Sequence, residues 1–248
     1  MKGKRMSKVI SAEEIGRNWQ QLNDEVKESA LKAGRQPEDI TIIPVSKTHP
    51  VEMVYNAMEA GVRLFGENYA QELKDKHEHF EKSGKTEPEW HFIGHLQSNK
   101  VKYIAPYVSM IHSVDSVKLA KEISKRAVQN EREIDILIQV NTSGEESKSG
   151  CEPGELESII REVNEFENLK IKGLMTIAGL FGSDEENRKE FRLLKELLDD
   201  MKSKFPNNEL KHLSMGMTGD FRMAIEEGST MVRVGTAIFG ARDYSANN

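Results

Sequence analysis

The sequence contains one cysteine, Cys151, and therefore cannot form an intrachain disulfide. Proteins of reducing compartments rarely use disulfides, so this count predicts a cytoplasmic location. No apolar run reaches the roughly 18 residues of a membrane span, and we expect no membrane partner. The basic start MKGKRMSKVI has no apolar stretch of the kind that secretory signals carry. We expect residues 1–10 to be a short disordered segment.

Other signatures are missing as well. The formal net charge is −6 at pH 7 and no basic stripe is present, which argues against a nucleic-acid partner. His91 and His95 share one face of a strand candidate, but no third ligand follows at a suitable spacing, so we expect no metal site. No GxGxxG motif opens an early helix, which disfavours dinucleotide binding. No linker rich in Pro, Gly or Ser divides the chain, so we expect one domain.

Eight short β-branched or apolar runs indicate strands, and most are separated by helical patterns. The strand candidates are residues 41–46, 63–68, 90–95, 110–115, 135–141, 171–177, 210–216 and 231–237. Helical patterns cover residues 11–34, 49–61, 115–130, 152–166 and 183–205. This alternation predicts an α/β fold, a (β/α)8 TIM barrel over residues 11–244 with an extra N-terminal helix and a tail at 245–248. An open doubly wound sheet is the competing architecture.

Lys47 follows the first strand candidate, where a positive charge is unusual. Ile43, Val45 and Lys47 alternate onto one face, and functional residues of such barrels lie at the carboxyl ends of the strands. Two interpretations are open. The ammonium group reaches solvent while its stem packs on apolar surface, or desolvation above an apolar floor favours the neutral, nucleophilic amine. Pro44 is unfavourable inside a strand, so we expect this strand to be short or irregular.

The last two strand candidates carry residues suited to an anion. Arg233 lies between two valines on a buried strand and needs an acceptor, because it does not deprotonate. Gly235 and Thr236 follow it, and the loop LSMGMTGDF supplies Ser214, Gly216, Thr218 and Gly219. Loops after strands seven and eight of such barrels often hold phosphate. Strand one neighbours strand eight in a closed barrel, so Lys47 joins this group. A nucleophilic lysine, a phosphate cradle and an inward arginine suit pyridoxal 5′-phosphate (PLP).

Eight segments then carry a resemblance to a known family: VSKTHP, FGENYAQE, WHFIGHLQSNK, HSVDS, IQVNTSGEESKSG, GLMTIA, LSMGMTGDF and VRVGTAIFGARDY. They resemble the pyridoxal phosphate homeostasis protein family, single-domain barrels similar to the N-terminal domain of alanine racemase (fold type III PLP proteins). The resemblance implies that Lys47 forms the Schiff base, that Asn68 lies near the cofactor ring and its 3′-oxygen, and that Arg233 faces the pyridine nitrogen. It also implies that the phosphate is held by Ser214, Gly235 and Thr236, with His91 and Met215 as wall residues.

Family members resemble carriers that buffer and supply PLP and have no firmly established enzyme activity. The resemblance therefore implies PLP homeostasis, with PLP-dependent apo-enzymes as the expected recipients of the cofactor. The alternative is an amino-acid racemase that uses PLP bound to Lys47 and a second base such as Tyr69 or His91. Because the chain stops at Asn248, soon after strand eight, we expect no racemase-type second domain and a monomer. A class I aldolase is a further, more distant alternative.

Overall fold

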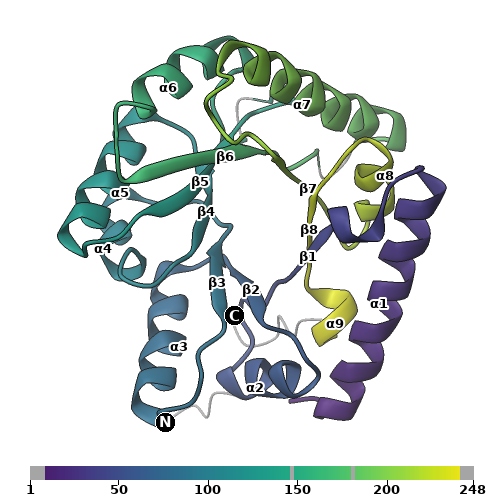
Figure 1. Ribbon diagram of the computed structural model, residues 1–248. Coiled ribbons are helices and arrows are strands. Elements are labelled where there is room, and N and C mark those ends of the chain that lie inside the picture. The colour runs from purple at the N-terminus through teal and green to yellow at the C-terminus, as the bar shows by residue number, and fades with distance from the viewer. Residues whose placement is uncertain (1–8, 146–147, 180–181, 241–248) are drawn as a thin grey trace.

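The computed structural model describes residues 9–145, 148–179 and 182–240 of the chain. Within these residues eight parallel strands form one sheet in the order β1-β8-β7-β6-β5-β4-β3-β2. The strands curve around a common centre, with helices on the outside (Figure 1). Their bounds are β1 (Thr41–Pro44), β2 (Leu64–Glu67), β3 (Glu89–Phe92), β4 (Met110–Val114), β5 (Ile134–Gln139), β6 (Leu169–Met175), β7 (His212–Met217) and β8 (Met231–Val234). The predicted (β/α)8 barrel is confirmed.

The two ends of the sheet meet just after β1. Val45 forms an isolated parallel bridge with Gly66 of β2, and the Ser46 N–H donates to the Gly66 carbonyl at 3.1 Å. Strand β1 ends at Pro44, as expected for a residue that has no N–H to donate to a ladder. This closure places Lys47 at the seam between the first two strands.

Helices cover the outer face of the barrel (Figure 1). The expected N-terminal helix is present as α1, and the Ser11 side chain caps it by accepting the Glu14 N–H at 3.2 Å. The described α-helices are α1 (Ala12–Lys32), α2 (Val51–Glu59), α3 (Ala70–Ser83), α4 (Val101–Ile104), α5 (Val117–Gln129), α6 (Leu156–Val163), α7 (Asp184–Lys204), α8 (Phe221–Glu226) and α9 (Thr236–Phe239). Short 3₁₀ turns span Pro37–Asp39, Ser98–Lys100 and Pro153–Glu155.

Two expected helices are shorter than their patterns. The pattern over 49–61 becomes α2, because Pro50 is extended and the helix begins after it. The pattern over 152–166 divides into a 3₁₀ turn and α6. The expected tail at 245–248, and residues 1–8 of the expected disordered start, lie outside the described residues. None of the helices in the described residues combines the length and apolar character that crossing a bilayer requires.

Side-chain alternation along the strands produces two apolar layers. The larger layer fills the space between sheet and helices and includes Val232 and Val234 of β8. The smaller cluster comprises Ile43, Met110, Leu137, Met175 and Met231, one residue from each of five strands. Side chains alternate along a strand, so Arg233 lies on the same face of β8 as Met231. The expected placement of Arg233 opposite its two valine neighbours is thereby confirmed.

Candidate cofactor site

A cavity of about 370 Å³ lies at the carboxyl ends of the strands, within the usual size range of small-molecule sites. Its lining combines apolar walls with convergent polar groups from several loops. It is formed by Val45, Lys47, Asn68, Ile93, Lys148, Ile177, Met217, Thr218, Gly219, Arg233, Gly235 and Thr236. Five of the six site residues that the sequence predicts therefore meet here: Lys47, Asn68, Arg233, Gly235 and Thr236.

Arg233 is the buried cation of this cavity, with 4% of its surface exposed. Its guanidinium donates to two neutral acceptors, the Ser214 hydroxyl at 2.7 Å and the Thr176 carbonyl at 2.9 Å. Burial lowers the pKa of Arg233 to about 10, and the Asp220 carboxylate opposes that change. The group therefore remains a cation at neutral pH and is held in one orientation by two hydrogen bonds.

Ser214, the sixth predicted residue, does not line the cavity. It is fully buried lower on β7, where its hydroxyl contacts Arg233 and lies 2.9 Å from His112 Nδ1. The geometry makes Ser214 a support for Arg233, and its expected contact with phosphate stays a prediction.

A line of polar side chains continues from Ser214 through the barrel interior. His112 Nε2 lies 3.0 Å from His91 Nδ1, and His91 Nε2 lies 3.2 Å from the Glu89 carboxylate. Glu89 starts β3 and is exposed, so the line runs from the amino ends of the strands to the cavity floor. Desolvation, with the neighbouring His91 adding to it, lowers the pKa of His112 well below its usual value. The neutral His112 ring thus lies between the buried Arg233 guanidinium and the solvent at the amino ends of the strands.

Asn68 follows β2 and lines the cavity. Its Oδ1 is buried and has no hydrogen-bond partner among the described residues. Gly94, after β3, permits this placement, because a Cβ at that position would lie 2.2 Å from the Asn68 carbonyl oxygen. A glycine is therefore required for the β3 loop to pack against Asn68.

Thr218 and Gly219, which the sequence already indicates as part of the small-residue loop after β7, line the cavity. The structure adds further residues to the predicted set. Lys148, from the polar loop after β5, and the apolar side chains of Ile93 and Ile177 also line the cavity. The strand-end position of these residues is the signal that could have found them, since the carboxyl ends of all strands meet at one face.

Two residues expected as cavity walls lie elsewhere. His91 is buried in the polar line that leads to His112. Met215 packs in the outer apolar layer between sheet and helices. Met215 alternates with Ser214 along β7, so an inward Ser214 requires an outward Met215. The expectation for these two wall positions is therefore wrong.

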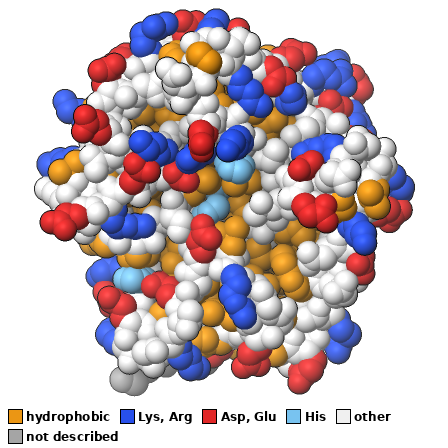
Figure 2. Space-filling view, in the orientation of Figure 1, with side chains coloured by type: hydrophobic (Ala, Val, Ile, Leu, Met, Phe, Trp, Pro, Cys, Tyr) orange, Lys and Arg blue, Asp and Glu red, His pale blue; other side chains and the backbone are white. Residues whose placement is uncertain are grey.

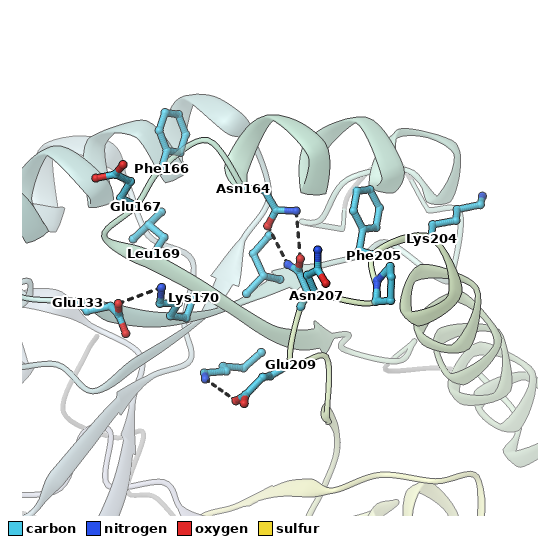
Figure 3. Close-up of a pocket in the computed structure, with 14 residues that line it drawn as sticks. Glu133, Asn164, Phe166, Glu167, Leu169, Lys170, Lys204, Phe205, Asn207 and Glu209 are labelled. Atoms are coloured by element: carbon cyan, nitrogen blue, oxygen red, sulfur yellow. Dashed lines mark hydrogen bonds and ion pairs between the residues drawn. The ribbon is translucent and has the colours of Figure 1, made fainter.

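A second, larger cavity of about 710 Å³ lies at the amino ends of β5, β6 and β7. Its polar side chains pair with one another. Figure 3 shows the ion pair of Glu133 with Lys170 and the side-chain hydrogen bonds of Asn164 with Asn208. Lys172 similarly pairs with Glu209 at 3.1 Å. Figure 2 shows acidic and basic side chains interspersed over the face in view. Polar side chains that already pair with one another have few donors and acceptors left for a ligand. The smaller cavity is therefore the better candidate site.

Comparison with known proteins shows which family the chain belongs to. The family model for the N-terminal domain of alanine racemase matches residues 10–243. The chain is 42% identical over 232 residues to the pyridoxal phosphate homeostasis protein of Vibrio alginolyticus, covering 93% of this chain and 99% of that protein. It is 40% identical over 235 residues to the protein of the same name from Escherichia coli K12, covering 94% and 98%.

Solved structures show the same fold. PipY of Synechococcus elongatus, solved with PLP bound, superposes with a TM-score of 0.80 at 31% identity, covering 91% of this chain and 100% of PipY. Alanine racemase from Corynebacterium glutamicum shares the fold, with a TM-score of 0.66 at 16% identity over 94% of this chain and 63% of the racemase. From the family model and the curated relatives, we conclude that this chain belongs to the pyridoxal phosphate homeostasis protein family, built on an alanine racemase N-terminal-domain barrel.

Proposed function

We propose that this protein binds PLP in the cavity at the carboxyl ends of the strands and acts in PLP homeostasis. The observation that carries the proposal is the meeting of Lys47, Arg233 and the small-residue loops after β7 and β8 in one cavity. The bound PLP of PipY and the names of the curated relatives support it. When bound, PLP supplies an aldehyde and an electron-accepting ring.

The residues of the cavity fit the parts of this cofactor. Lys47 provides the amine that holds the cofactor as a Schiff base. Arg233 would donate to the pyridine nitrogen, and Asn68, which also lines the cavity, would lie near the ring and its 3′-oxygen. The apolar side chains of Val45 and Ile177 provide walls for the ring.

The loops after the last two strands are suited to the phosphate. Gly235 and Thr236 follow β8, and Thr218 and Gly219 follow β7. Small residues allow backbone N–H groups to approach an anion, and the two threonine hydroxyls add donors. Because Ser214 lies below the cavity, we assign the serine-type contact on the β7 side to Thr218.

The residue positions favour a carrier over a racemase. An arginine at the pyridine nitrogen leaves that nitrogen unprotonated, so the ring is a weak electron sink; this disfavours transamination and β-elimination but leaves racemisation possible. Racemisation needs a second base on the opposite face of the substrate, and neither Tyr69 nor His91 is among the described residues that line the cavity. His95 lines a smaller adjoining cavity of about 200 Å³ and is a further candidate for such a base.

The test is the absorption spectrum of wild type and Lys47→Ala, each mixed with PLP. We expect a long-wavelength Schiff-base band in the wild type and its loss in the variant, with residual non-covalent binding through the phosphate loops. Lys148→Ala is the matched control, because Lys148 is the other lysine of the cavity. Borohydride reduction followed by peptide mapping should place the adduct on Lys47. An adduct on Lys148, or no adduct, would refute the assignment.

The function beyond binding needs separate measurements. Chiral analysis after incubation with L- or D-alanine separates a carrier from a racemase, and we expect no inversion of configuration. Transfer is tested by mixing the loaded protein with a PLP-dependent apo-enzyme and following recovery of that enzyme's activity. The monomeric state stays a prediction, which sedimentation of the full chain would check.

A further inference from the structure

A buried charged cluster lies beside the backbone that carries Lys47. It consists of Glu67 at the end of β2 together with Glu72 and Lys76 on α3. Glu67 is fully buried and Lys76 is 4% exposed, which is unusual for a lysine on an outer helix. Glu72 and Lys76 are four residues apart, so both project from the same face of α3. Glu67 and Glu72 belong to the FGENYAQE segment, and Lys76 lies one helical turn after it. Only Asn68 of that segment takes part in the proposed cofactor site.

The cluster bonds to the residues on both sides of Lys47. Before it, the Ser46 carbonyl accepts from Lys76 Nζ at 2.8 Å, and the Ser46 hydroxyl donates to Glu67 Oε1 at 2.7 Å. After it, the Thr48 N–H donates to Glu72 Oε1 at 2.7 Å. Lys76 itself pairs with both Glu67 and Glu72. The Lys76 ammonium group thus links the contacts before Lys47 with the contact after it.

The backbone at this point needs such support. Thr48 has a φ of 65°, in the left-handed region that β-branched residues strongly disfavour. The turn is closed by the His49 N–H, which donates to the Ser46 carbonyl at 3.1 Å. The Ser46 carbonyl therefore accepts two hydrogen bonds, one from the turn and one from Lys76. Without the side-chain contacts, Thr48 has a lower-energy conformation available, and that conformation would re-aim Lys47.

A purely structural ion pair would need only Glu67 and Lys76, which would hold α3 against β2. The cluster does more, since it makes three further hydrogen bonds, two with Ser46 and one with Thr48. We propose that Lys76 and Glu72 are positioning residues that clamp the backbone on both sides of Lys47 and so aim its amine into the cavity. This inference rests on the proposed function for its consequence, because the aimed amine is the one that holds PLP.

The test removes the clamp without leaving a buried charge unpaired. Burial raises the pKa of Glu67 and the Lys76 ammonium opposes that change, so the two are altered together as Glu67→Gln/Lys76→Met. The introduced amide can still accept from the Ser46 hydroxyl. The matched control is Lys74→Met/Glu78→Gln, which removes an ion pair at 3.0 Å on the exposed part of the same helix. A second variant, Glu72→Ala, leaves the buried pair intact and removes only the acceptor of the Thr48 N–H.

Three readouts are compared with wild type: thermal unfolding, amide hydrogen exchange of residues 46–49, and the rate of Schiff-base formation with PLP. We expect both clamp variants to keep a cooperative transition, to exchange faster at residues 46–49, and to form the Schiff base about tenfold more slowly, because small misplacements of a reacting group are costly. The control should match the wild type in all three.

Unchanged exchange and an unchanged rate in folded clamp variants would overturn the inference and leave Lys76 a structural residue. If the double variant fails to fold, Glu72→Ala decides the question alone. If the wild type itself forms no Schiff base, the proposed function fails. Amide exchange and the rate at which Lys47 reacts with a generic aldehyde, read by peptide mapping, still report on the clamp in that case.

Discussion

The two ends of the barrel each have a cavity, and the larger one is the less suited to a ligand. At the amino ends of β5 to β7, Lys170 and Lys172 pair with Glu133 and Glu209 in partly exposed positions. At the carboxyl ends, Arg233 is buried and donates to two neutral acceptors. Exposed ion pairs already neutralise each other's charge, so they contribute little to stability and do not call for an ionic ligand. A buried cation whose hydrogen-bond partners in the described residues are neutral favours an anionic or acceptor ligand. Burial and partner chemistry, more than volume, distinguish the two ends.

The largest expected effect follows from changing the buried cation, as Arg233→Gln. Loss of a charged hydrogen bond costs about 2 kcal/mol, so we expect PLP to bind about thirtyfold more weakly. Equilibrium titration of the purified variant with PLP measures this, and thermal unfolding of the apo protein checks that it folds. Wild-type affinity in a folded Arg233→Gln variant would show that the guanidinium does not face the cofactor.

The polar line between the two ends predicts a pH dependence of stability. The pKa of His112 lies well below 6.5 in the folded protein because the ring is buried, whereas the unfolded chain takes up the proton near 6.5. The unfolded state therefore binds more protons below that pH, and the free energy of unfolding falls as pH decreases, by up to about 1.4 kcal/mol per unit.

His112→Gln should remove this part of the slope between pH 6.5 and 5. Denaturant unfolding at several pH values measures it, and the difference between variant and wild type cancels groups common to both. Burial also lowers the pKa of His212, so a smaller slope of the same sign should remain in the variant. Equal slopes in the two proteins would mean that His112 takes up its proton in the folded state as readily as in the unfolded chain.

A smaller effect tests which residue on the β7 side holds the phosphate. Thr218→Val removes one hydroxyl donor, so we expect PLP affinity to fall by about 1 kcal/mol, or about fivefold. Pyridoxal, which lacks the phosphate, should bind the variant and the wild type equally. A comparable loss for pyridoxal would place Thr218 at the ring and return the phosphate role to Ser214.

The smallest effect belongs to the amino end. Lys170→Gln breaks an ion pair whose members are 48% and 54% exposed, and we expect a loss of stability below about 0.5 kcal/mol. PLP affinity should be unchanged, because the change lies at the far end of the barrel. A measurable effect on affinity would mean that the two ends are coupled, and the comparison drawn above would need revision.

The outline of the fold was predictable from the sequence. Alternating apolar patterns indicated all eight strands, and strand periodicity placed Arg233 on the face opposite its two valine neighbours. For Lys47 the same periodicity left an outward and an inward interpretation open. Boundaries were less predictable: the pattern over 90–95 extends past β3, because Gly94 turns to pack on Asn68. The loop motif and the resemblance indicated Ser214 as a phosphate contact, but neither gives the depth of that residue along the barrel axis.

The sequence by itself determined the barrel, because the barrel depends on local periodicity and on the order of strands along the chain. The family and most residues of the cavity were indicated by motifs that resemble those of known proteins. Only the tertiary structure decided that Ser214 supports Arg233, that Thr218 reaches the cavity, and that Lys76 contacts the backbone beside Lys47. These contacts join residues distant in the sequence, some across the barrel interior. Their distances depend on how strands shift against each other in register, which no local pattern encodes.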